Sequence, residues 1–184
     1  EAYAYNFPEA FCYGDDIAEI DPQCVLNDLQ LQPGELTCLL ASPPCQPFSA
    51  ATPKPSDYDE RRNLYTHMIE FVKIFKPRCI FIENVQKQIK HGNDFSLLAN
   101  EKIVPVFEEL GYTVNASILD ASQYGVPQVR KRYILIAHCC KNEFEWPIAF
   151  DSIISVEEAL SDLALIKPQE IIAQNVPLLY GEVQ

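Results

Sequence analysis

The sequence predicts an α/β fold in which helices flank a mostly parallel sheet. Short apolar runs, of the kind that form strands buried on both faces, alternate with longer segments whose apolar residues recur at helical spacing. Some of these apolar runs also stop abruptly at polar or reactive residues, as at the edge of an open α/β sheet where ligands bind. The 184 residues are enough for one domain with a hydrophobic core.

The first expected elements are short. Residues 1–9 are expected to be a loop or the end of a helix, and residues 11–13 (Phe-Cys-Tyr) a short strand that a polar turn closes at Gly14. A continuous apolar run over 36–41 predicts a buried strand. That strand must end before the two prolines that follow, because proline has a fixed φ and no amide hydrogen for a sheet.

The middle of the chain predicts a loop, a helix and a second buried strand. Residues 50–62 are polar and have no hydrophobic period, so we expect a loop long enough to close over a site; the alternative is a disordered surface segment. Apolar residues recur at helical spacing over 63–75, and a Lys-Pro pair ends this helix. The apolar run 79–82 is the next strand, and it stops at Glu83.

The remaining elements follow the same alternation. A helix is expected over 95–110, and Gly111 ends it. Strands are expected over 112–119 and 133–137, on either side of a turn at 124–127. An amphipathic helix is expected over 156–165, capped by Ser155 with Glu158 three residues later.

Composition excludes several classes of protein. The chain has no apolar run long enough to span a membrane, and its first residues do not resemble a secretory signal. Its seven cysteines are odd in number and form no Cys-x-x-Cys pair, which argues against a disulfide framework or a zinc site and for a reducing compartment. The three histidines have no metal-binding spacing, so we expect no metal.

The net charge of −12 is unevenly distributed. Residues 1–44 carry a net charge of −8, residues 45–132 one of +2 and residues 133–184 one of −6. Twelve of the fourteen Lys and Arg residues lie in the middle range. Local positive charge, and not net charge, governs contact with phosphates, although chance clustering on solvated surfaces would give the same pattern.

Cys45 is the first candidate for chemistry. It follows Pro44 directly, on the turn where the strand over 36–41 ends, and a thiolate is a strong nucleophile. The alternative for a cysteine is a small, buried and inert apolar residue. The rigid Pro-Pro turn favours the reactive interpretation.

Glu83 and two arginines are further candidates. A carboxylate that ends a buried strand costs free energy unless it has a partner or a raised pKa; the alternative is an edge residue in water or a helix cap. Arg130 and Arg132, two residues apart on an extended segment, should point the same way. Their planar forks suit carbonyl, phosphate and carboxylate oxygens, but a solvated basic edge is the commoner structure.

The turn after 11–13 carries the last candidates, Asp16 and Ile17. An acid after a strand of a doubly wound sheet often reaches a hydroxyl or amino group of a cofactor. The same acid can instead cap a helix by accepting backbone N–H bonds.

Three motifs together are more specific than any one of them. They stand in order, with strand and helix alternating between them: Pro44-Cys45-Gln46, Glu83-Asn84-Val85 and Gln128-x-Arg130-x-Arg132. In this order and placement, the chain resembles the DNA (cytosine-5) methyltransferase family over roughly residues 6–165.

The resemblance implies a Rossmann-like fold, S-adenosylmethionine as cofactor and double-stranded DNA as substrate. Cys45 would add to carbon 6 of a flipped-out cytosine, so that carbon 5 can take the methyl group. Glu83 would hold or protonate ring N3, Arg132 would bind the carbonyl oxygen of the base, and Arg130 would support Glu83 or the loop.

The resemblance also assigns a cofactor site. Asp16 and Ile17 would lie against the adenine, and Pro44 and Leu64 would lie near the cofactor. No Gly-x-Gly occurs among the six glycines, although the family has a glycine-rich loop that cradles the methionine part. We therefore expect residues 1–165 to be a partial catalytic core, incomplete at its N-terminus, and residues 166–184 to be a linker toward a missing target-recognition region.

Three hypotheses remain open. The first is a monomeric DNA methyltransferase of a bacterial or phage modification system, in the cytoplasm, or in the nucleus if the source is eukaryotic; RNA stays an alternative substrate. The second is a catalytically silent methyltransferase-like module that binds DNA or a partner. The third is a cysteine hydrolase that uses Cys45 with His67 or His91.

Because the glycine-rich loop is missing, residues 1–184 alone are expected to bind S-adenosylmethionine weakly or not at all. Isothermal titration calorimetry of this chain checks the expectation. Binding in the low micromolar range would contradict it.

Overall fold

The computed structural model describes residues 2–43, 64–85, 95–141 and 143–163. The chain forms two compact units. The first unit consists of Glu1–Leu119 and Lys131–Trp146, and the second consists of Asp120–Arg130 and Pro147–Gln184.

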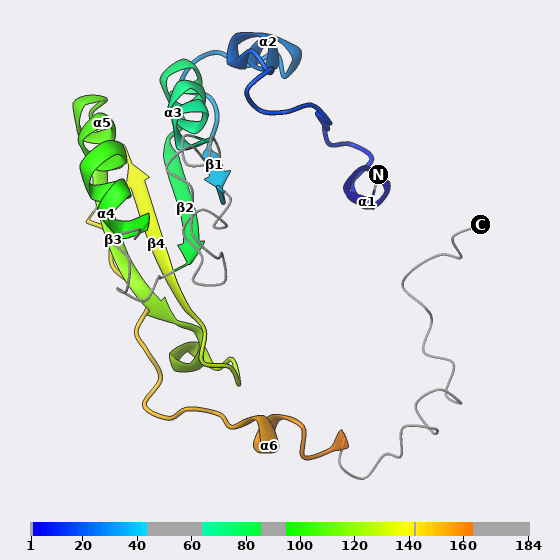
Figure 1. Cartoon of the computed structure of the whole chain (residues 1–184), viewed down its shortest axis with the longest axis vertical. Helices are drawn as coiled ribbons and strands as arrows, with labels where there is room; N and C mark the ends of the chain where they lie inside the picture. Colours follow the sequence, from blue (N-terminus) through cyan, green and yellow to red (C-terminus); the bar gives the residue numbers. More distant parts are fainter. Residues whose placement is uncertain (1, 44–63, 86–94, 142, 164–184) are drawn as a thin grey trace, which may run out of the picture. The chain divides into compact units, whose positions relative to one another are not determined.

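The first unit is built on a four-stranded sheet with the order β1-β2-β4-β3. The strands are β1 (Cys38–Ala41), β2 (Cys79–Val85), β3 (Thr113–Asp120, whose last residue belongs to the second unit) and β4 (Lys131–His138). β1 and β2 run parallel, whereas β2 and β4 run antiparallel (Figure 1).

The α/β fold class is confirmed, but the described sheet is mixed and not mostly parallel. β4 follows β3 through residues 121–130, and a parallel crossover needs a connection of about a dozen residues or more. β4 therefore returns beside β3 in the opposite direction (Figure 1).

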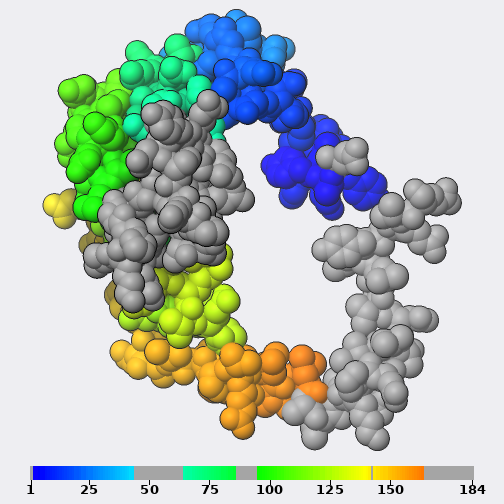
Figure 2. All heavy atoms as spheres, viewed as in Figure 1, coloured from blue at the N-terminus to red at the C-terminus, as the bar shows by residue number. Residues whose placement is uncertain are grey.

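Helices cover one face of this sheet. The described helices of this layer are α3 (Leu64–Phe75), α4 (Phe95–Leu98), the π-helix η3 (Ala99–Ile103) and α5 (Val104–Glu109). Alternate strand residues point toward them and are fully buried, namely Ile80, Ile82, Leu135 and Ala137. In Figure 2 the surfaces of α3 and of α4–α5 adjoin, in agreement with the single core that their side chains share with the sheet.

β2 is longer than the predicted strand over 79–82. Its pairing with β4 continues past Ile82, because Glu83 lies opposite Ile134 and Val85 lies opposite Arg132. Glu83 therefore lies within the paired strand, whereas the sequence predicted that the strand ends before it. The predicted strand over 133–137 is extended by the same pairing and includes Arg132.

The predicted helix over 95–110 is present but is divided by its π-helix. We infer that Pro105 causes this division. Proline has no amide hydrogen for the helical hydrogen bonds, so the backbone of the preceding turn must adjust. Gly111 ends the helix as predicted, with φ of 88°. The amides of Gly111 and Tyr112 donate to the carbonyls of Glu108 and Phe107 at 2.9 and 3.0 Å.

Two features of the N-terminal segment differ from the prediction. Residues 11–13 form no strand, because no described strand pairs with them, and Phe11 is 64% exposed. The short helix α1 (Ala2–Asn6) agrees with the expected helix end or loop, whereas α2 (Pro22–Asp28) was not predicted. Its signals are present: Asp21 caps it by accepting from the amide of Gln23 at 2.8 Å, and a proline opens it.

The second unit begins with the 3₁₀ helix η4 (Ala121–Tyr124) and contains the short helix α6 (Val156–Ala159). The predicted cap is confirmed, because Ser155 Oγ accepts from the amide of Glu158 at 3.0 Å. The helix is shorter than the predicted range 156–165, because it ends at Ala159. Its apolar residues Val156 and Leu160 are exposed, and a short helix without packing is only marginally stable.

No described helix is both long and apolar enough to cross a membrane.

Replacing Leu135 by Ala should lower the free energy of unfolding by about 2–5 kcal/mol, because its side chain is fully buried against the helices. Chemical denaturation measures the change. The matched control is Leu97→Ala at a position that is 53% exposed, where a change of less than about 1 kcal/mol is expected. Equal losses in the two variants would contradict the assigned core.

Candidate active site

The carboxyl ends of β1 and β2 meet at one edge of the sheet. Their parallel register pairs Ala41 with Ile82, so Ser42 and Glu83 are the next residues along each chain. Ser42 Oγ donates a hydrogen bond to Glu83 Oε2 at 2.9 Å. The residue that directly follows β1, three positions before Cys45 in the chain, is thus in contact with the predicted catalytic carboxylate.

Arg132 is the ionic partner of Glu83. Its Nε lies 2.8 Å from Glu83 Oε1. The antiparallel register explains the contact, since Glu83 lies opposite Ile134 and its diagonal neighbour on the same face is Arg132. The Glu83 side chain is 32% exposed and that of Arg132 is 23% exposed, so the pair is half-buried. The resemblance implied that Arg130 supports either Glu83 or the loop; the described ion pair of Glu83 is made with Arg132.

Asn84 points to the helix-covered face of the sheet and is 2% exposed. Its Nδ2 donates to the carbonyl oxygen of Pro43 at 3.0 Å, while its Oδ1 accepts from the amide of Val85 at 2.8 Å. Asn84 therefore fixes the backbone directly before Pro44 and Cys45, which themselves lie outside the described residues.

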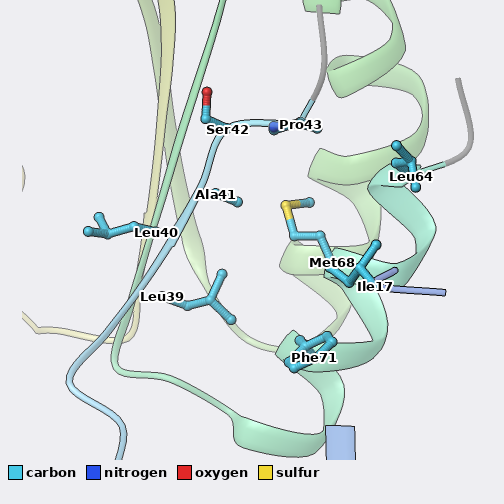
Figure 3. A pocket seen from close by; sticks show the side chains of 9 residues that line it. All are labelled: Ile17, Leu39, Leu40, Ala41, Ser42, Pro43, Leu64, Met68 and Phe71. Carbon is cyan, nitrogen blue, oxygen red and sulfur yellow. The ribbon is translucent and has the colours of Figure 1, made fainter. Parts of the chain in front are cut away.

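A cavity of about 410 Å³ lies between the end of β1 and helix α3 (Figure 3). Its lining is almost entirely apolar. The side chains that line it are Ile17, Leu39, Leu40, Ala41, Ser42, Pro43, Leu64, Met68 and Phe71.

The cavity brings together some of the predicted cofactor residues. Ile17 and Leu64 both line it, whereas Asp16 does not. The Asp16 carboxylate accepts from the amide of Ala18 at 3.0 Å, so it caps a turn, as the alternative interpretation of this acid has it. Contact of Asp16 with a cofactor remains a prediction.

Arg130 belongs to the second unit and is exposed. Its amide donates to Asp120 Oδ1 at 3.1 Å, and its carbonyl oxygen accepts from the amide of Ala121 at 3.0 Å. These contacts fix the backbone of Arg130. Its common direction with Arg132 remains a prediction, because the two arginines belong to different units.

Ser42, Met68 and Phe71 were not among the predicted site residues, and Asn84 was named only as part of the motif Glu83-Asn84-Val85, without a role. Met68 and Phe71 had a usable signal, since they follow Leu64 at spacings of four and seven on the predicted helix and so share its face. The contacts of Ser42 with Glu83 and of Asn84 with Pro43 had none, because these partners are more than 40 positions apart in the chain.

Two of the described cysteines, Cys79 and Cys24, are held in the protonated thiol form. Burial, with Cys38 beside it, raises the pKa of Cys79 to about 11. The hydrogen bond to Asp21 raises the pKa of Cys24. The proposed hydrolase partner His67 has its Nδ1 3.8 Å from Glu70 on the same helix, and His91 lies outside the described residues. The described residues contain no cluster of three or more His, Cys, Asp or Glu that could hold a metal ion.

The fold and the site together define an α/β domain in which a polar cluster of Ser42, Glu83 and Arg132 and an apolar cavity lie at the edge of the sheet where β1 and β2 end. Within this class, the chain belongs to the C-5 cytosine-specific DNA methylase family, whose model matches residues 1–179.

The similar curated proteins agree with this assignment. The Type II methyltransferase M.AgeI of Thalassovita gelatinovora is 37% identical over 133 residues, which are 72% of this chain and 30% of that protein. The Type II methyltransferase M.HhaI of Haemophilus parahaemolyticus is 30% identical over 165 residues, 87% of this chain and 46% of that protein. The chain thus spans less than half the length of these two relatives.

Solved structures show the same fold. A DNMT2 mutant of Spodoptera frugiperda matches with a TM-score of 0.53 and 28% identity, over 83% of this chain and 43% of that one. A putative DNA modification methyltransferase encoded within an Escherichia coli prophage matches with a TM-score of 0.63 over 86% of this chain and 43% of that one. At 24% identity, the second likeness concerns the fold alone.

Replacing Asn84 by Asp should lower the free energy of unfolding by about 1–3 kcal/mol, because a buried acceptor would face the Pro43 carbonyl in place of a donor. Chemical denaturation measures this change.

The matched control is Asn27→Asp on α2. Asn27 is exposed, and its Oδ1 accepts from Gln23 Nε2, a contact that Asp keeps. A change within about 0.5 kcal/mol is expected for the control. Equal effects at the two positions would show that the Pro43 contact contributes nothing.

Proposed function

We propose that the protein containing this chain transfers a methyl group from S-adenosylmethionine to carbon 5 of cytosine in double-stranded DNA. Family membership supports the reaction class. The observation that carries the assignment of roles is the half-buried Glu83 carboxylate, held on both oxygens beside the turn that leads to Cys45.

Carbon 5 of neutral cytosine is a poor nucleophile. Addition of the Cys45 thiolate to carbon 6 makes an enamine whose carbon 5 can attack a methyl group. Negative charge that would develop on the ring is neutralised if a proton is held at N3, and we assign this to the carboxyl of Glu83. A base then takes the proton from carbon 5, the thiolate leaves carbon 6, and N3 returns its proton to Glu83, which releases the methylated base and restores the enzyme.

The proposed nucleophile needs a rigid support, and the residues before it provide one. The hydrogen bond from Asn84 to Pro43 holds the chain two residues before Cys45. Addition at a ring face cannot occur inside stacked DNA, so the target base must be flipped out of the helix. Because the backbone at Pro43 is fixed, we expect the proposed nucleophile to be favourably placed to attack a base that enters from the solvent side.

The residues of the cavity fit the apolar part of a nucleoside cofactor. Ile17, Leu64 and Phe71 give it apolar walls, and its volume of about 410 Å³ is in the range of small-molecule sites. S-adenosylmethionine, when bound, supplies an activated methyl group. We propose that these residues hold its adenine and that Pro44 lies near it.

Arg132 can contact both Glu83 and the base. Its fork has five N–H donors, of which Nε faces Glu83 and one on Nη1 is donated to the Lys131 carbonyl at 2.8 Å. We assign a further donor to the carbonyl oxygen of the cytosine. For Arg130 we propose support of the loop, from a backbone that Asp120 fixes.

Mechanism-based trapping tests the proposal. The full-length protein, incubated with S-adenosylmethionine and DNA that carries 5-fluorocytosine, should form a covalent adduct, because fluorine at carbon 5 cannot leave as a proton does. Peptide mapping should place the adduct at Cys45. The Cys45→Ser variant should form none.

The Cys79→Ser variant is the matched control, since that cysteine is kept in the thiol form, and it should still form the adduct. A wild-type protein that binds DNA without forming an adduct would instead be the catalytically silent module.

A further inference from the structure

Glu83 has a different partner on each of its two oxygens. Arg132 Nε lies 2.8 Å from Oε1, and Ser42 Oγ lies 2.9 Å from Oε2. The two partners come from opposite sides of β2, since Ser42 follows β1 and Arg132 lies on β4. The carboxylate is therefore held across three adjacent strands and cannot rotate without losing a partner.

The two partners are not equivalent in chemistry. A guanidinium can only donate, so the oxygen that faces Arg132 must keep a lone pair toward it. A hydroxyl can donate or accept, and it can rotate to suit its partner. Ser42 can therefore remain hydrogen-bonded to Oε2 whether or not that oxygen carries a proton, whereas a proton on Oε1 would weaken the charge-assisted contact with Arg132.

We propose that Ser42 is a positioning residue that assigns the catalytic proton of Glu83 to Oε2 and directs it at ring N3 of the target cytosine. The inference rests on the proposed function of Glu83. The hydroxyl donates to one lone pair of Oε2, and the proton on the same oxygen is left to point at the base.

The position of Ser42 is fixed independently of its own hydrogen bond. The residue after it, Pro43, is held through its carbonyl oxygen by the buried side chain of Asn84. Together with the parallel pairing of Ala41 and Ile82, this contact fixes the backbone on both sides of Ser42. The hydroxyl is thus presented to Glu83 by a rigid backbone, although its side chain is accessible to solvent.

Steady-state methylation by the full-length protein tests the proposal. Ser42→Ala should lower kcat by about three- to tenfold, as expected for the loss of one hydrogen bond that acts in the reaction. KM for DNA and for S-adenosylmethionine should stay within about twofold, because the substrate binds as before. Ser42→Thr keeps the hydroxyl and should restore most of kcat.

The matched control is Thr37→Ala, which removes an exposed hydroxyl just before the opposite end of β1 and should leave kcat unchanged. A second arm compares Ser42→Ala in the wild-type and Glu83→Asp backgrounds, in single-turnover reactions with enzyme in excess. The shorter Asp cannot reach Ser42, so the serine substitution should have no further effect there.

Three results would overturn the proposal: an unchanged kcat in Ser42→Ala, no recovery in Ser42→Thr, or the same fold-loss in both backgrounds. Unequal melting temperatures of Ser42→Ala and wild type would reveal a general structural effect, and the Glu83→Asp comparison separates it from action through Glu83. A wild-type protein that methylates no cytosine would refute the proposed function itself, before Ser42 is changed.

Discussion

The parallel pairing of β1 with β2 is the constraint on which the site depends. Both strands run toward the same edge, so the turn after β1 must begin beside the end of β2. Two side-chain hydrogen bonds then join the strands beyond their backbone ladder, from Ser42 to Glu83 and from Asn84 to Pro43. A slip of one residue in this register would turn Glu83 toward the helices and Asn84 away from them, because strand side chains alternate between faces. Burial of Ile80 and Ile82 under α3 and α5 opposes such a slip.

Side chains along β2 alternate between the two faces of the sheet, so Glu83 and the supporting residue Asn84 point to opposite faces. Glu83 points to the face that the described helices leave accessible, the side from which the target base would approach in the proposed reaction. Asn84, the next residue, points into the core, where a buried amide is stable only because its donor and its acceptor are both used. One adjacent pair of residues thus places the carboxylate that we propose to be catalytic and fixes the backbone that leads toward the proposed nucleophile. The same rule on β4 puts Arg132 beside Glu83 and Tyr133 in the core.

The sequence predicts what is local. Continuous apolar runs located β1 and β2, and the helical stripe located α3, because burial on both faces or on one face leaves a periodic record in the chain. Gly111 and Ser155 were correctly predicted as a helix end and a cap, because a left-handed glycine and a capping hydroxyl act within a few residues of the helix end. What depends on distant partners could not be predicted. The run 11–13 has strand composition, but no strand among the described residues pairs with it, and pairing with β4 lengthened β2 through Val85. The Ser42–Glu83 bond depends on a register that no single segment encodes, and Pro44 and Cys45 lie outside the described residues, so their placement stays a prediction.

The intermediate burial of the Glu83–Arg132 pair suits a reaction better than either extreme. A fully exposed pair contributes about 0–1 kcal/mol and would leave both side chains free to move. A fully buried pair is costly to form, and any movement of one partner leaves an unpaired charge in a medium of low dielectric constant. With 32% and 23% exposure, the two side chains are ordered by strand pairing and still reached by solvent. In the proposed reaction, a base that enters this edge replaces solvent on the accessible side of the carboxylate, while Arg132 stays at Oε1. The pair would then take up the base without first being broken, and the free energy that orders the two side chains comes from the sheet and not from the ion pair itself.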